Sequence, residues 1–161
     1  MNVNRAVLYL GCFSIGVIAG LRSLTAPALV SWAARLGWLD LSGSWLSFLG
    51  SRTAVFILSL LALAELVADK LPKTPKRTDL GPLVFRAITG AFSSMALCAS
   101  AHQPLVIGAI LGVLGAIAGA FAGYEIRHRW VEAFGLADLG VALAEDIVAI
   151  GGGLLLVSHM F

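Results

Sequence analysis

Charged residues are scarce in this sequence. Only 12% of its 161 residues are Asp, Glu, Lys or Arg, whereas soluble domains carry about 25%. With 59% of the residues hydrophobic, these few charges could not cover a soluble domain of this size. The net charge of +2 is also too small for a nucleic-acid-binding face, which needs a dense basic patch. The composition therefore predicts an integral membrane protein whose first partner is the lipid bilayer.

Cysteine and histidine are also few. Cys12 and Cys98 are isolated within apolar runs, without the CxxC or Cys/His spacing of a metal or redox site, so we interpret both as small packing residues. His102, His128 and His159 lie far apart in the sequence, and no GxSxG motif or paired nucleophile and base is present. We expect no metal, no cofactor and no enzymatic activity.

Apolar runs make up most of the chain. A helix that crosses the bilayer needs about 20 mostly apolar residues, and five runs reach or approach that length. They are Ala6–Gly20, Thr53–Ala68, Leu83–Ala101, Leu105–Tyr124 and Leu139–Val157. A further candidate is Ser23–Gly50, in which Pro27 can begin a helix and Trp32, Trp38 and Trp45 suit the membrane interface; it is either a short span or a surface helix. The sequence thus predicts one all-α membrane domain over residues 1–161, with five or six transmembrane helices.

Basic residues indicate which side is cytoplasmic. Lys70–Asp79 (KLPKTPKRTD) carries four basic residues and two prolines, and Arg127–Arg129 follows two crossings later. By the positive-inside rule both are cytoplasmic. We therefore expect an integral protein of a bacterial inner (plasma) membrane with loop 70–79 in the cytoplasm. The rule does not place the N-terminus, because the balance of basic residues is the same for five crossings and for six.

Short stretches match between the two halves of the chain. The matches are Ala62–Ala68 (ALAELVA) with Ala142–Val148 (ALAEDIV), and Arg5–Val7 with Arg86–Ile88. Two copies of three segments, residues 1–80 and 81–161, would be inverted relative to each other, as in many transporters. This favours six segments. Against it, Glu65 and Glu145 both lie near the cytoplasmic ends of their runs, where true inversion would put them at opposite depths.

A stripe of glycines follows one side of the fourth apolar run. Its members are Gly108, Gly112, Gly115, Gly119 and Gly123. Small residues at this spacing let helix backbones approach closely. We expect helix packing within the protomer or in a two-fold homodimer, with a pore-lining or ligand-facing surface as the alternative.

Ionisable residues occur within or beside the apolar runs, where a charge costs about 2.5–3.5 kcal/mol at mid-bilayer. They are Glu65, Asp69, Glu145, Asp146, Arg22 and Arg86. Either the acids neutralise nearby Arg and Lys residues in structural salt bridges, or they form a proton or cation relay or a substrate-binding cluster.

Gly151–Gly153 follows the last acids by one turn, and three glycines in a row predict an unwound helix that lines a cavity.

Several motifs together resemble the small membrane family called domain of unknown function 4126, over nearly the whole chain. The motifs fall on Gly20, on Glu65, Ala68, Asp69, Lys70 and Pro72, on Arg86 with Gly90-Ala91, and on Glu145-Asp146. The chain departs from many relatives at Arg22-Ser23, where these carry Asn and Tyr. The family name supplies no activity, so function rests on the residues.

These residues suggest two functions of different classes. The first is a small transporter or channel-like protein that moves an ion or a small polar or anionic solute through a cluster of the acids with Arg22 and Arg86, near the cytoplasmic side. The alternative is a membrane scaffold or assembly factor that transports nothing and whose acids form structural salt bridges. The sequence does not indicate which solute is moved.

Overall fold

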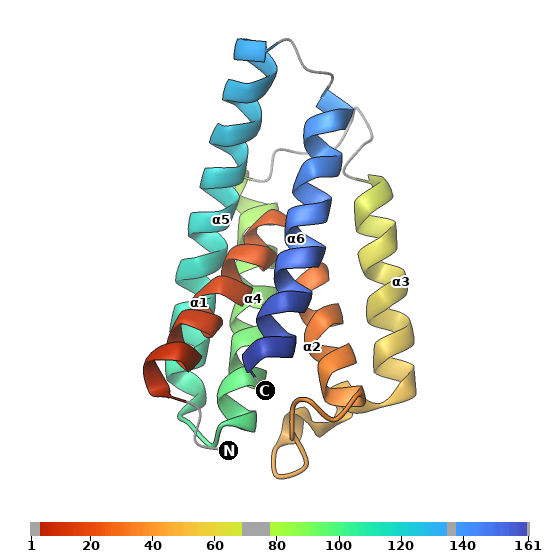
Figure 1. Ribbon diagram of the computed structural model, residues 1–161, viewed down its shortest axis with the longest axis vertical. Helices are drawn as coiled ribbons and strands as arrows, with labels where there is room; N and C mark the ends of the chain where they lie inside the picture. The colour runs from red at the N-terminus through yellow and green to blue at the C-terminus, as the bar shows by residue number, and fades with distance from the viewer. Residues whose placement is uncertain (1–3, 69–77, 135–137, 161) are drawn as a thin grey trace.

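The described chain is helical throughout. The computed structural model describes residues 4–68, 78–134 and 138–160, and these form six α-helices and one short 3-10 helix, with no strand among them (Figure 1). In chain order the helices are α1 (Arg5–Leu21), α2 (Thr25–Arg35), η1 (Trp45–Gly50), α3 (Arg52–Ala68), α4 (Leu80–Ser100), α5 (Leu105–Phe134) and α6 (Asp138–Met160). The predicted all-α fold class is confirmed.

The helices lie side by side and alternate in direction. α1 starts at the end of the bundle where α6 finishes, α2 returns toward it, and α3 to α6 continue the alternation (Figure 1). We call this end the terminal end. The opposite end, where α3 finishes and α4 begins, is called the α3–α4 end.

Three of the helices are long and apolar enough to cross a membrane, and one shorter helix is also apolar. The long ones are Leu80–Ser100, Leu105–Arg127 and Gly140–His159, and the shorter one is Arg5–Leu21. Large apolar side chains are exposed on all six α-helices. Such a surface suits lipid contact and supports a membrane protein. The number of spans stays a prediction.

The glycine stripe of α5 packs against backbone. A Cβ atom at Gly115 would lie 2.1 Å from the carbonyl oxygen of Phe13 in α1, and one at Gly112 would lie 2.3 Å from the carbonyl oxygen of Gly90 in α4. No side chain fits at these distances. The missing side chains therefore let α5 approach both helices closely enough for extensive van der Waals contact.

The rest of the stripe also lies inside the protomer. Gly108 faces backbone of α4, Gly119 faces backbone of α1, and Gly123 is buried. The stripe is thus covered by helices of the same chain. A homodimer stays a prediction and would need another surface.

α6 continues without a break through Gly151–Gly153. The prediction that these glycines unwind the helix is therefore wrong. Gly153 packs so closely that a Cβ atom there would lie 2.2 Å from Cδ1 of Leu29, whereas Gly151 and Gly152 face open space. The absence of a side chain at Gly153 thus lets α6 lie close to α2.

The predicted inverted repeat has partial support in the helix directions. α1 to α3 run opposite to α4 to α6, as inversion requires (Figure 1). The matched motifs, however, do not lie at equivalent places. Glu65 is the fourth residue from the end of α3, whereas Glu145 is the eighth residue of α6. Arg5 begins α1, whereas Arg86 lies within α4. The repeat therefore stays a prediction.

Candidate functional site

A buried break separates α1 from α2. α1 ends at Leu21, Arg22 has an extended backbone (φ −141°, ψ 104°), and α2 begins at Thr25. Pro27 explains the break, because in one continuous helix its ring would clash with the carbonyl oxygen of Ser23. In the first turn of a new helix, by contrast, the missing N–H of proline removes no hydrogen bond. The N–H groups of Ser23 and Leu24 therefore have their partners outside α1 and α2.

Glu65 of α3 caps the start of α2. Leu24 at the N-cap position cannot cap the helix with its own side chain. Instead, Oε1 of Glu65 accepts the Ser23 N–H at 2.8 Å and the Ser23 hydroxyl, and Oε2 accepts the Leu24 N–H at 2.7 Å. A carboxylate at this position satisfies open backbone donors and interacts favourably with the positive end of the helix dipole.

Arg86 of α4 contacts both sides of the break. Its Nη1 donates to the carbonyl oxygen of Gly20 at 2.9 Å, and its Nη2 lies 3.9 Å from Oε1 of Glu65. A cation thus faces the carbonyl end of α1 while an anion faces the amide end of α2. Both charges complement the helix dipoles.

Arg22 forms the second ion pair of the site. Its side chain is fully buried, and its Nε donates to Oδ1 of Asp146 in α6 at 2.6 Å. Next to it, the hydroxyl of Thr25 is buried and has no hydrogen-bond partner among the described residues. Buried charges are costly unless they are paired and hydrogen-bonded, and these are paired.

We call Arg22, Glu65, Arg86 and Asp146 the polar cluster. It lies toward the α3–α4 end of the bundle. At 1.5 Å per residue, Glu65 is about 5 Å from the end of α3, Arg86 about 9 Å from the start of α4, and Asp146 about 12 Å from the start of α6. This is the end at which the sequence predicts the cytoplasm.

The structure brings together four of the six ionisable residues that the sequence singled out. Glu145 is half-buried and lies about 100° around α6 from Asp146, because successive helical residues differ by that angle. Asp69 lies outside the described residues.

Sequence reasoning missed the backbone groups of the site. The N–H groups of Ser23 and Leu24 and the carbonyl of Gly20 each make a polar contact in the site, and a backbone group cannot be recognised from the residue type. The available signal was Pro27, which predicts a helix start and therefore open N–H groups just before it.

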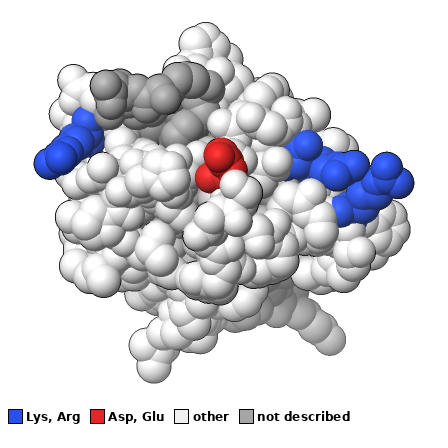
Figure 2. All heavy atoms as spheres, turned by 90° about the horizontal axis from the view of Figure 1, so that it is seen from below, with Lys and Arg blue, Asp and Glu red and all other residues white. Residues whose placement is uncertain are grey.

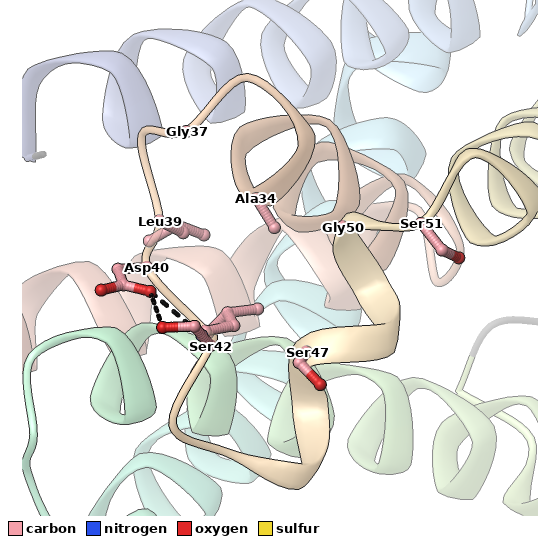
Figure 3. A pocket seen from close by; sticks show the side chains of 9 residues that line it. Ala34, Gly37, Leu39, Asp40, Ser42, Ser47, Gly50 and Ser51 are labelled. Atoms are coloured by element: carbon pink, nitrogen blue, oxygen red, sulfur yellow. Dashed lines mark hydrogen bonds between the residues drawn. The ribbon is translucent and has the colours of Figure 1, made fainter.

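A hollow of about 700 Å³ lies at the terminal end, beyond the other end of α2 (Figure 3). It is lined by Ala34, Gly37, Leu39, Asp40, Leu41, Ser42, Ser47, Gly50 and Ser51. Oδ1 of Asp40 accepts the Ser42 hydroxyl at 2.6 Å and the Ser42 N–H at 3.0 Å, and these bonds hold the pKa of Asp40 below its ordinary value. No member of the polar cluster lines this hollow.

The face at the terminal end carries few charges. Figure 2 shows a mostly uncharged surface with one acidic spot near its centre and basic groups at two edges.

A metal site is not evident in the part of the chain that the structure describes. No three His, Cys, Asp or Glu side chains gather there as ligands. Both carboxylates of the polar cluster face guanidinium groups, which suits charge pairing rather than coordination of a cation.

The comparisons with known proteins identify a family but no activity. A family model described as Domain of unknown function (DUF4126) matches residues 9–160, which confirms the resemblance seen in the sequence and includes the whole polar cluster. Neither a curated protein nor a solved structure matches the chain.

Proposed function

The chain belongs to the DUF4126 family, whose description assigns no activity, and we therefore propose a function from its residues. The protein is a small integral membrane transporter or channel-like protein, not an enzyme. The polar cluster moves a small anionic solute.

The break between α1 and α2 is the observation that carries this proposal. In many transporters, substrates bind where a transmembrane helix is interrupted, and the N-terminus of the half-helix points at an anionic group of the substrate. Here the N–H groups of Ser23 and Leu24 point at the carboxylate of Glu65. A carboxylate of the protein thus lies where the carboxylate of a substrate lies in those transporters.

The chemistry of the contacts favours an anion over a cation. The groups around the Glu65 carboxylate are all donors: two backbone N–H groups, the Ser23 hydroxyl and the Arg86 guanidinium. If the Glu65 side chain swings out, these donors can bind another carboxylate or a phosphate. Glu65 then acts as an internal competitor of the solute.

The packing around α6 is incomplete, and this would allow α6 to move and expose the polar cluster. Hollows of about 310 Å³ and about 360 Å³ lie between α6 and α2 and between α6 and α1. α6 carries Asp146, so movement of α6 into either hollow would separate Asp146 from Arg22. The solute would then have access to the charges.

The proposal includes a six-segment topology. α2 has 11 residues, about 16 Å of helix, whereas the hydrocarbon core is about 30 Å thick. In our proposal the connection of residues 36–50 completes the crossing begun by α2 and brings the exposed Asp40 and Ser42 to the water outside. Both termini then lie outside, loop 70–79 lies in the cytoplasm, and the membrane is a bacterial inner membrane.

The scaffold function remains as the second candidate because the polar cluster is enclosed. Arg22 is fully buried and its Nε is bonded to Asp146. Such a cluster can hold helices together without binding a solute. The two functions differ in whether any anion crosses the membrane.

Flux measurements distinguish the transport function from the scaffold function. Purified protein is reconstituted in liposomes, and efflux of radiolabelled acetate and of radiolabelled phosphate is compared with protein-free liposomes. We expect flux of at least one anion, a large loss in Arg86→Gln, and altered flux in Glu65→Gln. Glu145→Gln reports whether that half-buried acid takes part. The matched control is Glu125→Gln, which removes an exposed carboxylate paired to Arg129 at 2.7 Å.

Two results would contradict the proposal. If neither anion leaves the liposomes faster than without protein, anion transport is wrong and the scaffold function is favoured. If Arg86→Gln and Glu65→Gln both show wild-type flux, transport exists but does not use the polar cluster.

A further inference from the structure

Cys12 of α1 and Cys98 of α4 lie in contact although 86 residues separate them. Their Sγ atoms are 3.6 Å apart, both thiols are fully buried, and both are reduced. This pair could not be predicted from the sequence, because each cysteine stands alone in its own apolar run. The two sulfurs would have to approach by about 1.5 Å to reach the 2.05 Å of a disulfide bond.

The helices around the two thiols are held close. The hydroxyl of Ser94 in α4 donates to the carbonyl oxygen of Cys12 at 2.7 Å. On the other side, Sγ of Cys98 lies where Gly108 of α5 has no side chain, since a Cβ atom there would be 2.9 Å from it. The sulfurs are therefore held in contact by packing on both sides.

Cys98 lies near the terminal end of the bundle. This residue is in the last turn of α4, which ends at Ser100, and the Gln103 N–H of the following connection donates to its carbonyl at 2.8 Å. The thiol is fully buried, so an oxidant reaches it only when this last turn opens locally. Hydrogen peroxide is small and uncharged and therefore needs only a small opening.

We propose that Cys12 and Cys98 form a redox modification site at which a hydroperoxide produces a disulfide between α1 and α4. One thiol gives up its proton, its sulfur attacks the O–O bond to form a sulfenic acid, and the hydroxide that leaves takes up that proton as water. The sulfur of the other cysteine then attacks the sulfenic sulfur, forms the S–S bond and releases a second water. Two thiols and one hydrogen peroxide give one disulfide and two waters, so the sulfurs lose the two electrons that the peroxide gains.

The disulfide would tie together the first helices of the two halves. Arg86 of α4 donates to the carbonyl oxygen of Gly20, in the last turn of α1, at 2.9 Å. The crosslink would hold this contact in place. The inference rests on the sulfur contact alone and does not require the proposed transport.

Counting free thiols tests the inference. Reduced protein in membrane vesicles is treated with hydrogen peroxide, quenched with catalase, denatured in SDS and labelled with a polyethylene glycol maleimide. We expect the number of labels to fall from two to zero, with a loss of two hydrogen atoms in the intact mass and recovery of both labels after reduction. Cys12→Ser and Cys98→Ser should show no loss of two hydrogen atoms, and any label that either variant loses as a sulfenic acid should return after reduction.

A relocated cysteine provides the matched control. Cys12→Ser combined with Ser14→Cys keeps two cysteines but moves one about 200° around α1, away from Cys98. This variant should form no disulfide between α1 and α4 after peroxide, so its mass should not fall by two hydrogen atoms. The inference is wrong if the wild-type protein keeps two labels, if its mass rises by oxygen atoms without a disulfide, or if the crosslink joins two chains on a non-reducing gel.

Discussion

The Nε of Arg22 donates to Oδ1 of Asp146 across 2.6 Å, although 124 residues separate them. The pair joins the break that follows the first helix of the N-terminal half to the third helix of the C-terminal half. Arg86 and Glu65 form the reciprocal pair, from the first helix of the C-terminal half to the third helix of the N-terminal half. Each half supplies one acid and one arginine, and each of these two pairs joins the two halves.

Removing one partner of the Arg22–Asp146 pair should lower the stability of the fold. Arg22→Gln or Asp146→Asn leaves the other charge buried, and we expect each to lower the free energy of unfolding by about 3–5 kcal/mol. The double variant should lose much less than the two single losses combined. Chemical unfolding in detergent micelles, followed by circular dichroism, measures all three. Strictly additive losses would contradict direct pairing, and Arg129→Gln, in an exposed pair, should change stability by about 0.5 kcal/mol or less.

Exchanging the charges of Glu65 and Arg86 should not restore folding. A simple salt bridge would tolerate Glu65→Arg with Arg86→Glu. Glu65, however, accepts backbone N–H groups of Ser23 and Leu24, which an arginine cannot do because it has no acceptor. We expect the double variant to unfold at least as readily as Glu65→Arg alone in the same detergent assay. Recovery of wild-type stability would show that only the charge pair matters.

Much of the fold could be predicted from the sequence. The long apolar runs gave the positions of α4, α5 and α6, and the glycine spacing indicated the close packing of α5. These signals are strong because lipid imposes both the length and the polarity of a spanning helix. The prediction that Gly151–Gly153 unwinds the last helix was wrong. A helix that packs against neighbouring helices tolerates glycines that would destabilise an isolated helix.

The site was predicted less completely. Intramembrane charge singled out Arg22, Arg86, Glu65 and Asp146, because such residues are too costly to occur without partners. Which acid meets which arginine depends on how the helices pack, and helix packing does not appear in sequence spacing. For the same reason the contact between Cys12 and Cys98 could not be foreseen.

Glycines of the α5 stripe should differ sharply from exposed glycines. Gly115→Ala would put a Cβ atom 2.1 Å from the carbonyl oxygen of Phe13, so α1 and α5 must separate, and we expect marked destabilisation of the monomer. Gly151→Ala enters open space within α6 and should stabilise by about 0.5–1 kcal/mol. Thermal unfolding of both variants in detergent gives the comparison. Equal unfolding temperatures for the two variants would mean that Gly115 of α5 does not pack closely against α1.

The hydrogen bonds from Ser42 to Asp40 should give a small pH dependence. They lower the pKa of Asp40 from its ordinary value of 3.8, so the folded protein binds this proton less readily than the unfolded chain. The resulting stabilisation is present above pH 3.8 and is lost as the pH falls through the lowered pKa. Asp40→Asn should therefore be less stable than wild type near neutral pH, and the difference should vanish in acid. In Ser42→Ala the titration midpoint of Asp40, followed by NMR, should rise toward its ordinary value; an unchanged midpoint would remove Ser42 as the cause.

The path of α1 and α2 decides the topology. If both lie within the membrane, as their burial against α4, α5 and α6 favours, the N-terminus lies opposite to the start of α4. A surface location of α2 would put both on the same side. Single cysteines at the exposed positions Asn4, Ser42 and Asp79, in a background with Cys12→Ser and Cys98→Ser, can be labelled in intact cells with an impermeant maleimide. We expect Asn4→Cys and Ser42→Cys to react from outside and Asp79→Cys to react only after permeabilisation, because the basic segment beside it should stay in the cytoplasm. Labelling of Asn4→Cys and Asp79→Cys from one side would rule out six segments and the inverted repeat together.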